Sequence, residues 1–371
     1  DSTSHSASEG FSGGTSPLKA EMRLTVWSYD NVASLNDVQF LKMQIINKNS
    51  SAWDSTYFGL VTDPDLGDAS DDFIGCDITR NLGYCYNADN TDGTGSGTSY
   101  GANPPAVGFR MLKSAKLSGG SELGITSLNY FTNSGSGGPT CEQDPSGAPV
   151  NAYNYLKGLK RDGTPFLNAA LTPPQITKFC FTGDPETGTG WTEYTGIIKN
   201  CGGATTGTVE ASSPGDRRLI IASGAGNLKV NPLDTQTFVV AQLIARGSNN
   251  KNSVTKLKQM CDTVQAAYAG NFVIGVNNIS TDVPEKYSLH QNYPNPFNPS
   301  TKIMFDINKS GFVSLTVFDI TGKEVTKLVS QNLAAGTYDY DFNAAGLPSG
   351  IYFYKLETAG YSEVKKMTLI K

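Results

Sequence analysis

The sequence predicts a mainly β protein with a large, β-sandwich-like N-terminal domain and a second, compact β-sandwich. Apolar and polar residues alternate with a period of two in many short segments, as in half-buried strands. The chain has 40 Gly and 18 Pro in 371 residues, which suits short strands joined by many turns. Long stretches between the strand-like segments predict long loops, with one or two helices in the first domain. A chain of this length can bury two cores.

Charge and hydropathy limit the partners. The net charge is -5, which argues against nucleic acid or an anionic membrane as the main partner. No run approaches the ~20 apolar residues of a membrane helix, so no membrane insertion is expected.

Residues 1–20 are expected to form an extended N-terminal arm. They are rich in Ser and Gly, and Phe11 and Leu18 are their only large apolar side chains. Burying both would gain about 3–5 kcal/mol, whereas ordering the arm costs about 1–2 kcal/mol per residue. We therefore expect backbone hydrogen bonds to a neighbouring subunit to hold it, with Phe11 and Leu18 as apolar contacts. Position 1 is Asp instead of Met, which is expected after removal of a signal peptide, although a trimmed chain would look the same.

Residues 21–274 are expected to form the β-rich body. Alternation at Met22, Leu24 and Val26 predicts its first strand. Further strands are predicted at 38–48, 57–61, 106–112, 125–131, 177–181, 218–222, 227–230 and 235–246. Apolar residues at steps of three and four predict a helix from Ser253, as its cap, to Gly270. A shorter helix is predicted at 152–160.

Residues 275–286 lack periodicity and are expected to be a linker. Alternation then returns in residues 287–371, for example at Ile303, Phe305 and Ile307. This pattern predicts a compact Ig-like β-sandwich. Its strands are expected at 302–307, 312–319, 324–330, 336–343, 350–358 and 361–370.

Four motifs in this last segment occur in a specific order. They are Tyr287-Ser-Leu-His-Gln-Asn-Tyr-Pro-Asn-Pro-Phe-Asn-Pro-Ser-Thr-Lys302, Val317-Phe-Asp-Ile-Thr-Gly-Lys-Glu-Val325, Gly350-Ile-Tyr-Phe-Tyr-Lys-Leu356 and Lys365-Lys-Met-Thr-Leu-Ile-Lys371. The segment resembles the type A C-terminal sorting domain of cargo of the bacterial type IX secretion system. The resemblance implies a seven-stranded Ig-like fold, recognition by that machinery, and a secreted or cell-surface location.

The body shows a looser resemblance. Its segments 54–68, 71–77 and 214–218 are similar to an uncharacterised secreted region that often precedes this sorting domain. That resemblance implies no activity.

The densest group of acidic residues lies between positions 63 and 77. It consists of Asp63, Asp65, Asp68, Asp71, Asp72 and Asp77. A loop of this kind can supply the six to eight oxygen ligands that Ca²⁺ takes, although the spacing is not that of an EF-hand. Two interpretations stay open: one Ca²⁺ held by some of these carboxylates, or a solvated acidic loop whose Asp side chains cap turns.

The six cysteines predict disulfides in an exported protein. Cys76–Cys85 and Cys180–Cys201 are the economical pairs, because each closes a short loop between expected strands. Cys141–Cys261 follows by elimination, although sequence cannot choose strictly among the pairings.

Catalysis is poorly supported by the sequence. The two histidines, His5 and His290, lie in the arm and in the last domain, so the body has no histidine base for a nucleophilic site. A carboxylate pair for glycoside hydrolysis stays open, because distance in space is not visible in the sequence. Trp27, Trp53 and Trp191 could form a sugar platform, although buried core aromatics are commoner.

Short Asp-Ser-Thr sequences at positions 1–3 and 54–56 match the O-glycosylation pattern common in bacteria with this export route. Ser2 and Ser55 are therefore the expected glycosylation sites.

Together these features predict a secreted, non-enzymatic structural protein, the subunit of an extracellular filament in which protomers exchange a strand or arm. Its partners would be copies of itself and the type IX machinery. The alternative is an exported monomeric hydrolase or carbohydrate-binding protein, with loops 84–101 or 141–155 forming the site. Two carboxylates or stacked aromatics in a cleft would favour that alternative.

Overall fold

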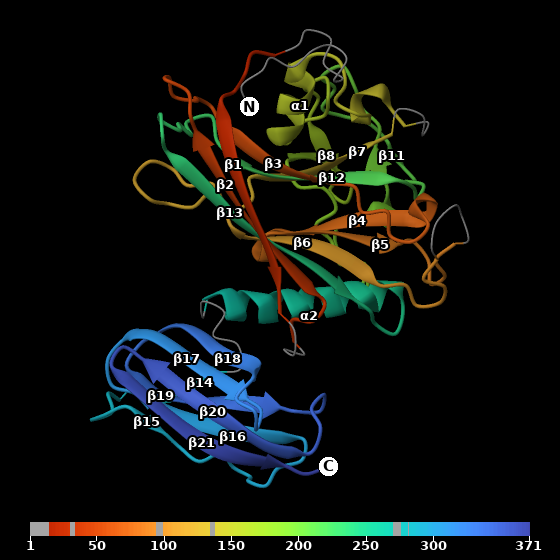
Figure 1. The fold of residues 1–371 in the computed structure, drawn as a ribbon. Helices are drawn as coiled ribbons and strands as arrows, with labels where there is room; N and C mark the ends of the chain where they lie inside the picture. Colours follow the sequence, from red (N-terminus) through yellow and green to blue (C-terminus); the bar gives the residue numbers. More distant parts are fainter. Residues whose placement is uncertain (1–14, 30–33, 94–98, 134–137, 270–275, 281) are drawn as a thin grey trace. The chain divides into compact units, whose positions relative to one another are not determined.

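The computed structural model describes residues 15–29, 34–93, 99–133, 138–269, 276–280 and 282–371 (Figure 1). These residues divide into two compact units. The body runs essentially to Gln265, and the second unit begins at Ala266. Both are built mainly from antiparallel strands, as predicted.

The body is organised around a six-stranded sheet with the order β1-β2-β13-β6-β5-β4. Its strands are β1 (Ala20–Ser28), β2 (Val38–Asn47), β13 (Thr235–Ala245), β6 (Ala106–Lys113), β5 (Leu82–Asn87) and β4 (Asp72–Asp77). Every neighbouring pair is antiparallel. The central strand β13 comes from late in the chain, so the sheet joins segments far apart in the sequence.

A smaller sheet packs on one face of this sheet, and a helix packs on the other (Figure 1). The smaller sheet has the order β3-β12-β7, formed by β3 (Tyr57–Thr62), β12 (Arg217–Gly224) and β7 (Ser127–Thr132). Phe58 of β3 and Phe238 of β13 meet between the sheets, with ring centroids 5.0 Å apart. On the far face lies α2 (Asn250–Ala269), where Arg110 of β6 donates to the carbonyl oxygen of Cys261 at 2.9 Å.

Short elements complete the body. They are α1 (Pro149–Leu156), the pair β8 (Phe166–Asn168) and β9 (Gln175–Thr177), and the pair β10 (Ile197–Ile198) and β11 (Val209–Glu210). Single 3₁₀ turns occur at Ala69–Asp71, Ile78–Arg80, Thr140–Glu142 and Glu193–Thr195.

The structure differs from the sequence predictions at several elements. β4 and β5 were not predicted, because their residues are buried on both faces and show no alternation. The strand predicted at 177–181 is reduced to the end of β9, and 227–230 forms only an isolated bridge between Val230 and Trp53. α2 begins at Asn250, so Ser253 lies inside the helix instead of capping it. Its hydroxyl donates to the carbonyl oxygen of Pro104 at 2.8 Å.

The second unit is a sandwich of two four-stranded sheets. One has the order β14-β19-β16-β15, with β14 (Val276–Ser280), β19 (Gly336–Asn343), β16 (Ser300–Ile307) and β15 (Ser288–Leu289). The other has the order β18-β17-β20-β21, with β18 (Glu324–Leu333), β17 (Gly311–Phe318), β20 (Gly350–Thr358) and β21 (Tyr361–Leu369). β14 lies inside the segment expected to be a linker, where it pairs with β19.

No helix among the described residues is long and apolar enough to cross a membrane.

Candidate functional site

Within the described parts of the chain, β1 is an uncovered edge of the six-stranded sheet. It pairs with β2 over its whole length, from Ala20 opposite Asn47 to Ser28 opposite Gln39. No other described strand pairs with it. Met22, Leu24 and Val26 are 63%, 56% and 47% exposed, and we call these three residues the β1 row. They lie on the sheet face that carries the core, so this face continues beyond the cover of the smaller sheet.

The core face turns polar one step further along the same strands. Ser28 of β1, Gln39 of β2 and Gln242 of β13 lie opposite one another in register. We call them the polar row. Because strand side chains alternate between faces, these three share a face with Val26 and with the buried Val240.

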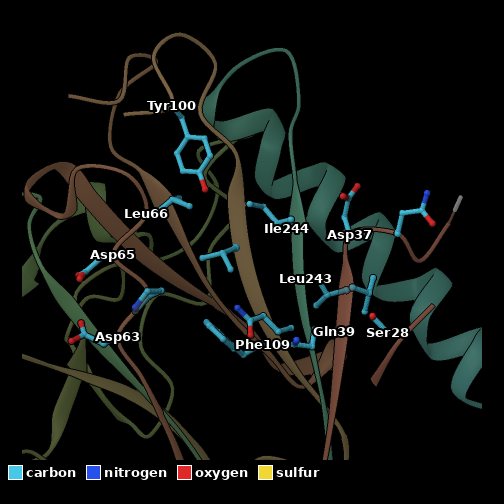
Figure 2. A pocket seen from close by; sticks show the side chains of 15 residues that line it. Ser28, Asp37, Gln39, Asp63, Asp65, Leu66, Tyr100, Phe109, Leu243 and Ile244 are labelled. Atoms are coloured by element: carbon cyan, nitrogen blue, oxygen red, sulfur yellow. The ribbon is translucent and has the colours of Figure 1, made fainter. Parts of the chain in front are cut away.

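A cavity of about 580 Å³ opens over the polar row. The polar row forms the floor of the cavity together with Phe109 of β6, which is paired with Gln242. One wall is the 63–66 segment that follows β3, and Asn36 and Asp37 before β2 contribute another. Figure 2 shows the Tyr100 hydroxyl pointing into the cavity from the side opposite Gln39 and Phe109.

Several polar side chains in this cavity have no partner within the protein. The side chains of Ser28, Asn36, Asp37, Gln39 and Gln242 make no hydrogen bond or ion pair with any residue that the structure describes. By contrast, Tyr100 is fixed from outside the cavity. Arg246 donates to the Tyr100 carbonyl oxygen at 2.9 Å, and its guanidinium lies 5.7 Å from the centre of the ring.

The six aspartates expected to hold calcium fall into different surroundings. Asp63 and Asp65 lie with Asp216, a residue that the sequence analysis did not include, and their carboxylate oxygens lie within 4.8 Å of one another. Arg218 also belongs to this group, at 3.1 Å from Asp63 and 2.7 Å from Asp216. Burial, and then the neighbouring Asp63 and Asp216, raise the pKa of Asp65.

The other four carboxylates are engaged elsewhere. Asp68 caps the first 3₁₀ turn, and Asp71 accepts from the Asn87 side chain at 2.6 Å and from the Gly93 amide at 2.8 Å. Asp77 pairs with Arg80 at 2.7 Å. Among the described residues, no other member of the acidic segment belongs to a group of three carboxylates as close together as Asp63, Asp65 and Asp216. Of the six expected ligands, only Asp63 and Asp65 belong to a group of three, and calcium binding itself stays a prediction.

Asp72 has the most perturbed of these carboxyls. It is 2% exposed, and one of its oxygens accepts from the Leu66 amide at 3.1 Å. Burial raises its pKa from 3.8 to about 8. The group is therefore protonated at neutral pH in the folded protein, which suits a structural role in β4 more than a metal ligand.

Two buried ion pairs lie inside the body. Lys160 donates to the Glu142 carboxylate, and Arg217 donates to Glu193 at 3.0 Å. Tyr130 and Ser212 also donate hydrogen bonds to Glu142 and Glu193, at 3.0 and 2.9 Å respectively.

Trp53 and Trp191 are buried in the core and Trp27 stacks on Phe40, so these three do not form an exposed sugar platform.

The disulfide is Cys141–Cys201, with Cα atoms 5.8 Å apart. The expected pairs Cys180–Cys201 and Cys141–Cys261 are therefore wrong, and Cys76, Cys85, Cys180 and Cys261 are free and buried. Cys76 lies opposite Gly83, and Cys85 lies opposite Ile74, so these two cysteines are diagonal neighbours. Diagonal neighbours are about 7–8 Å apart, too far for the Cβ separation that a disulfide requires.

The expected modification and assembly residues divide between described and undescribed parts. Ser2 and Phe11 lie outside the described residues. Ser55 is half-buried, and its hydroxyl donates to the Gly226 carbonyl oxygen at 2.9 Å. The Leu18 side chain is exposed, while its carbonyl oxygen accepts from the Trp53 indole at 3.2 Å, so the backbone there is attached to its own body.

In the second unit, the proline-rich motif is anchored by buried side chains. Phe297 is 2% exposed in the core, and its amide donates to the Thr368 carbonyl oxygen at 2.9 Å. Asn292 donates to Pro294 and Thr301 at 3.1 and 3.0 Å. Tyr293 is exposed. Most of the motif therefore builds the fold, and Tyr293 is its most accessible aromatic side chain.

Comparison with known proteins identifies this second unit. Residues 291–371 match the family model of the secretion system C-terminal sorting domain. This part of the chain is thus a type IX sorting domain, and the protein is exported to the cell surface or the extracellular space. No curated protein sequence matches the chain.

Two solved structures align over most of the chain, but with very low similarity. One is a polysaccharide lyase, with 6% identity and a TM-score of 0.25 over 94% of this chain and 34% of the lyase. The other is PorZ, a surface component of the type IX secretion system of Porphyromonas gingivalis. It has 12% identity and a TM-score of 0.18 over 94% of this chain and 45% of PorZ. The chain spans less than half the length of each of these proteins.

Proposed function

We propose that this exported protein is a non-enzymatic structural subunit that joins copies of itself by adding a strand to the free edge of β1. A free strand edge presents unpaired backbone groups to a second chain. Soluble proteins usually protect such edges with charges, prolines or bulges. β1 has nine residues, and its edge has neither proline nor a bulge against β2. Its two charged residues, Glu21 and Arg23, pair with each other at 2.7 Å on the face opposite the β1 row.

The β1 row is the observation that carries this proposal. Three large apolar side chains on one strand, each about half or more exposed, form an apolar surface of a kind that often marks an interaction site. A strand added at this edge would bring side chains over the β1 row and extend the core face. Backbone hydrogen bonds would supply affinity, and the apolar row would fix the register.

The incoming strand is proposed to come from the N-terminal arm of a second copy. Such head-to-tail contacts use two different surfaces and build open filaments. If two β1 strands instead paired with each other, the contact would close on itself and give a dimer. The two arrangements therefore differ in the size of the product.

Two observations support a non-enzymatic role. Residues 21–274 contain no histidine that could act as a base. The buried carboxylates of Glu142 and Glu193 are held in ion pairs. The alternative is an enzyme or a binding protein, and its site would be the cavity that Asp37 and Asp65 line.

The proposal is tested by electron microscopy and light scattering on the purified full chain. Leu24→Lys places a charge in the β1 row and should abolish polymers. Val150→Lys alters an equally exposed apolar residue on α1 and should leave them intact. Deletion of residues 1–14 should also abolish polymers if the arm is the donor, whereas dimers that survive this deletion would indicate β1–β1 pairing. A wild-type protein that stays monomeric at all concentrations would overturn the proposal.

A further inference from the structure

The polar row lies at one end of a largely apolar face, whose other glutamine, Gln236 of β13, bonds the backbone of Lys116. Along β2, the residues on this face are Gln39, Leu41, Met43 and Ile45, and along β13 they include Gln242, Val240 and Phe238. If the core only ended at this point, the side-chain amides of Gln39 and Gln242 would not need to lie next to each other. Gln39 and Gln242 are side by side, make no internal hydrogen bond with described residues, and line a cavity of about 580 Å³. This volume is within the range of small-ligand sites.

The charges of the lining limit the ligand. Asp37, Asp63 and Asp65 all line the cavity, and the described lining includes no Lys or Arg. An anionic ligand would be repelled by these carboxylates. Asp63 is already paired with Arg218, so the carboxylates of Asp37 and Asp65 carry most of this repulsion.

The amides limit the ligand further. An apolar ligand would remove Gln39 and Gln242 from water without giving them hydrogen bonds, which is unfavourable. Each amide offers both donors and acceptors, as do sugar hydroxyl groups. Tyr100 adds an aromatic side chain with a hydroxyl directed into the same space (Figure 2).

A peptide fits less well. Peptides bind sheets by pairing with the backbone of a free strand edge. The floor of this cavity is a sheet face, where β2, β13 and β6 already pair with one another. A peptide backbone lying there would find only isolated side chains.

We propose that the cavity over the polar row is a binding site for an uncharged oligosaccharide, with Gln39 and Gln242 hydrogen-bonding its hydroxyl groups and Tyr100 contacting one sugar ring. A second cavity of about 200 Å³ shares Asp37, Tyr100 and Ile244 with the first, so the site continues past Tyr100 as a groove for a chain of sugars. Arg246 also lines this second cavity, where its guanidinium is held by the carbonyl oxygens of Asn103 and Tyr100. This site is distinct from the β1 edge and does not depend on self-assembly.

The test is isothermal titration of the full-length protein with cellohexaose, xylohexaose and mannohexaose. An oligogalacturonate serves as the anionic comparison, and a Ser/Gly hexapeptide serves as the peptide comparison. Gln39→Ala and Gln242→Ala should each weaken binding of a neutral hexasaccharide roughly fivefold to tenfold. The double variant should remove binding, and Tyr100→Ala should weaken it.

Gln44→Ala is the matched control, because Gln44 lies on the same strand and faces the other side of the sheet. It should bind like the wild type. All variants should melt like the wild type, since the two amides make no internal hydrogen bond with described residues. The proposal is overturned if none of the three neutral hexasaccharides binds, if binding survives the double variant, or if only the peptide or the oligogalacturonate binds.

Discussion

Lys160 and Glu142 form an ion pair that is almost entirely removed from solvent, with side chains 1% and 3% exposed. The Lys160 ammonium also donates to the Asn200 side-chain oxygen at 2.6 Å. Glu142 and Asn200 are the chain neighbours of Cys141 and Cys201. One buried cation therefore holds together the two segments that the disulfide joins.

Removing this cation should strongly destabilise the body. Lys160→Met leaves the Glu142 carboxylate buried and unpaired, which we expect to cost about 3–5 kcal/mol in the free energy of unfolding. The double variant Lys160→Met/Glu142→Gln should lose less than the single variant. Urea unfolding of the body measures both.

Lys258→Met is the control for this ion pair. Lys258 pairs with Asp184 at 3.0 Å in a more exposed setting, and its loss should cost about 1 kcal/mol or less. Equal losses for Lys160→Met and Lys258→Met would contradict a special role for the buried cation.

The disulfide should stabilise the body measurably. Cys141 and Cys201 are 60 residues apart, and a loop of this length corresponds to about 4 kcal/mol in the chain-entropy model. A reductant should therefore lower the melting temperature of the wild type but not that of Cys141→Ser/Cys201→Ser. Alkylation after denaturation without reductant should label Cys76, Cys85, Cys180 and Cys261. A peptide linking Cys76 to Cys85 would contradict the structure.

Asp72 should make stability depend on pH. Burial raises its pKa to about 8 in the folded protein, from an ordinary value of 3.8. The folded state therefore keeps a proton that the unfolded state has lost, and this group's contribution to stability falls as pH rises from about 4 through 8. Asp72→Asn removes that dependence, so its stability relative to wild type should be higher at pH 8 than at pH 5.

Denaturant unfolding at the two pH values measures this difference. Asp54→Asn, at an exposed carboxylate, supplies the comparison. A constant difference between Asp72→Asn and wild type across the range would rule out Asp72 as the titrating group.

Calcium, if bound, should stabilise the folded body by mass action. The group of Asp63, Asp65 and Asp216 is the place to test, although Arg218 already neutralises part of its charge. Added Ca²⁺ should raise the melting temperature and EDTA should lower it, and Asp216→Asn should remove both effects. Asp77→Asn, at a carboxylate held by Arg80, should keep the response to Ca²⁺. Identical melting curves in Ca²⁺ and EDTA would end the calcium hypothesis.

Local patterns predicted most of the strands, because alternation is a property of neighbouring residues. Met22, Leu24 and Val26 mark β1 even though they are exposed, since they lie on the core face of the sheet. The same approach missed β4. Asp71 and Asp72 looked like part of an acidic loop, and Phe73 to Cys76 are buried without alternation.

Contacts between residues far apart in the chain could not be predicted from the sequence. Cys141 meets Cys201 next to Lys160, which binds the chain neighbours of both, and no spacing rule encodes that contact. Asp216 joins Asp63 and Asp65 only because β12 pairs with β3. One part of the cavity did leave a trace. Gln39 and Gln242 are polar residues at core-facing positions of two apolar strands, although their alignment depends on the register between β2 and β13.

The position of β14 changes where the transferable export signal should be taken to start. The family match begins at position 291, yet β14 at Val276–Ser280 and β15 at Ser288–Leu289 form the two outer strands of one sheet of that unit. A fusion that began at position 291 would lack β14 and β15, so β19 and β16 would become edge strands with unpaired backbone groups, which promote aggregation. A reporter protein intended for export should therefore be joined upstream of Val276. A processing protease that cleaved after Ser280 would release the body with a strand of its carrier still attached.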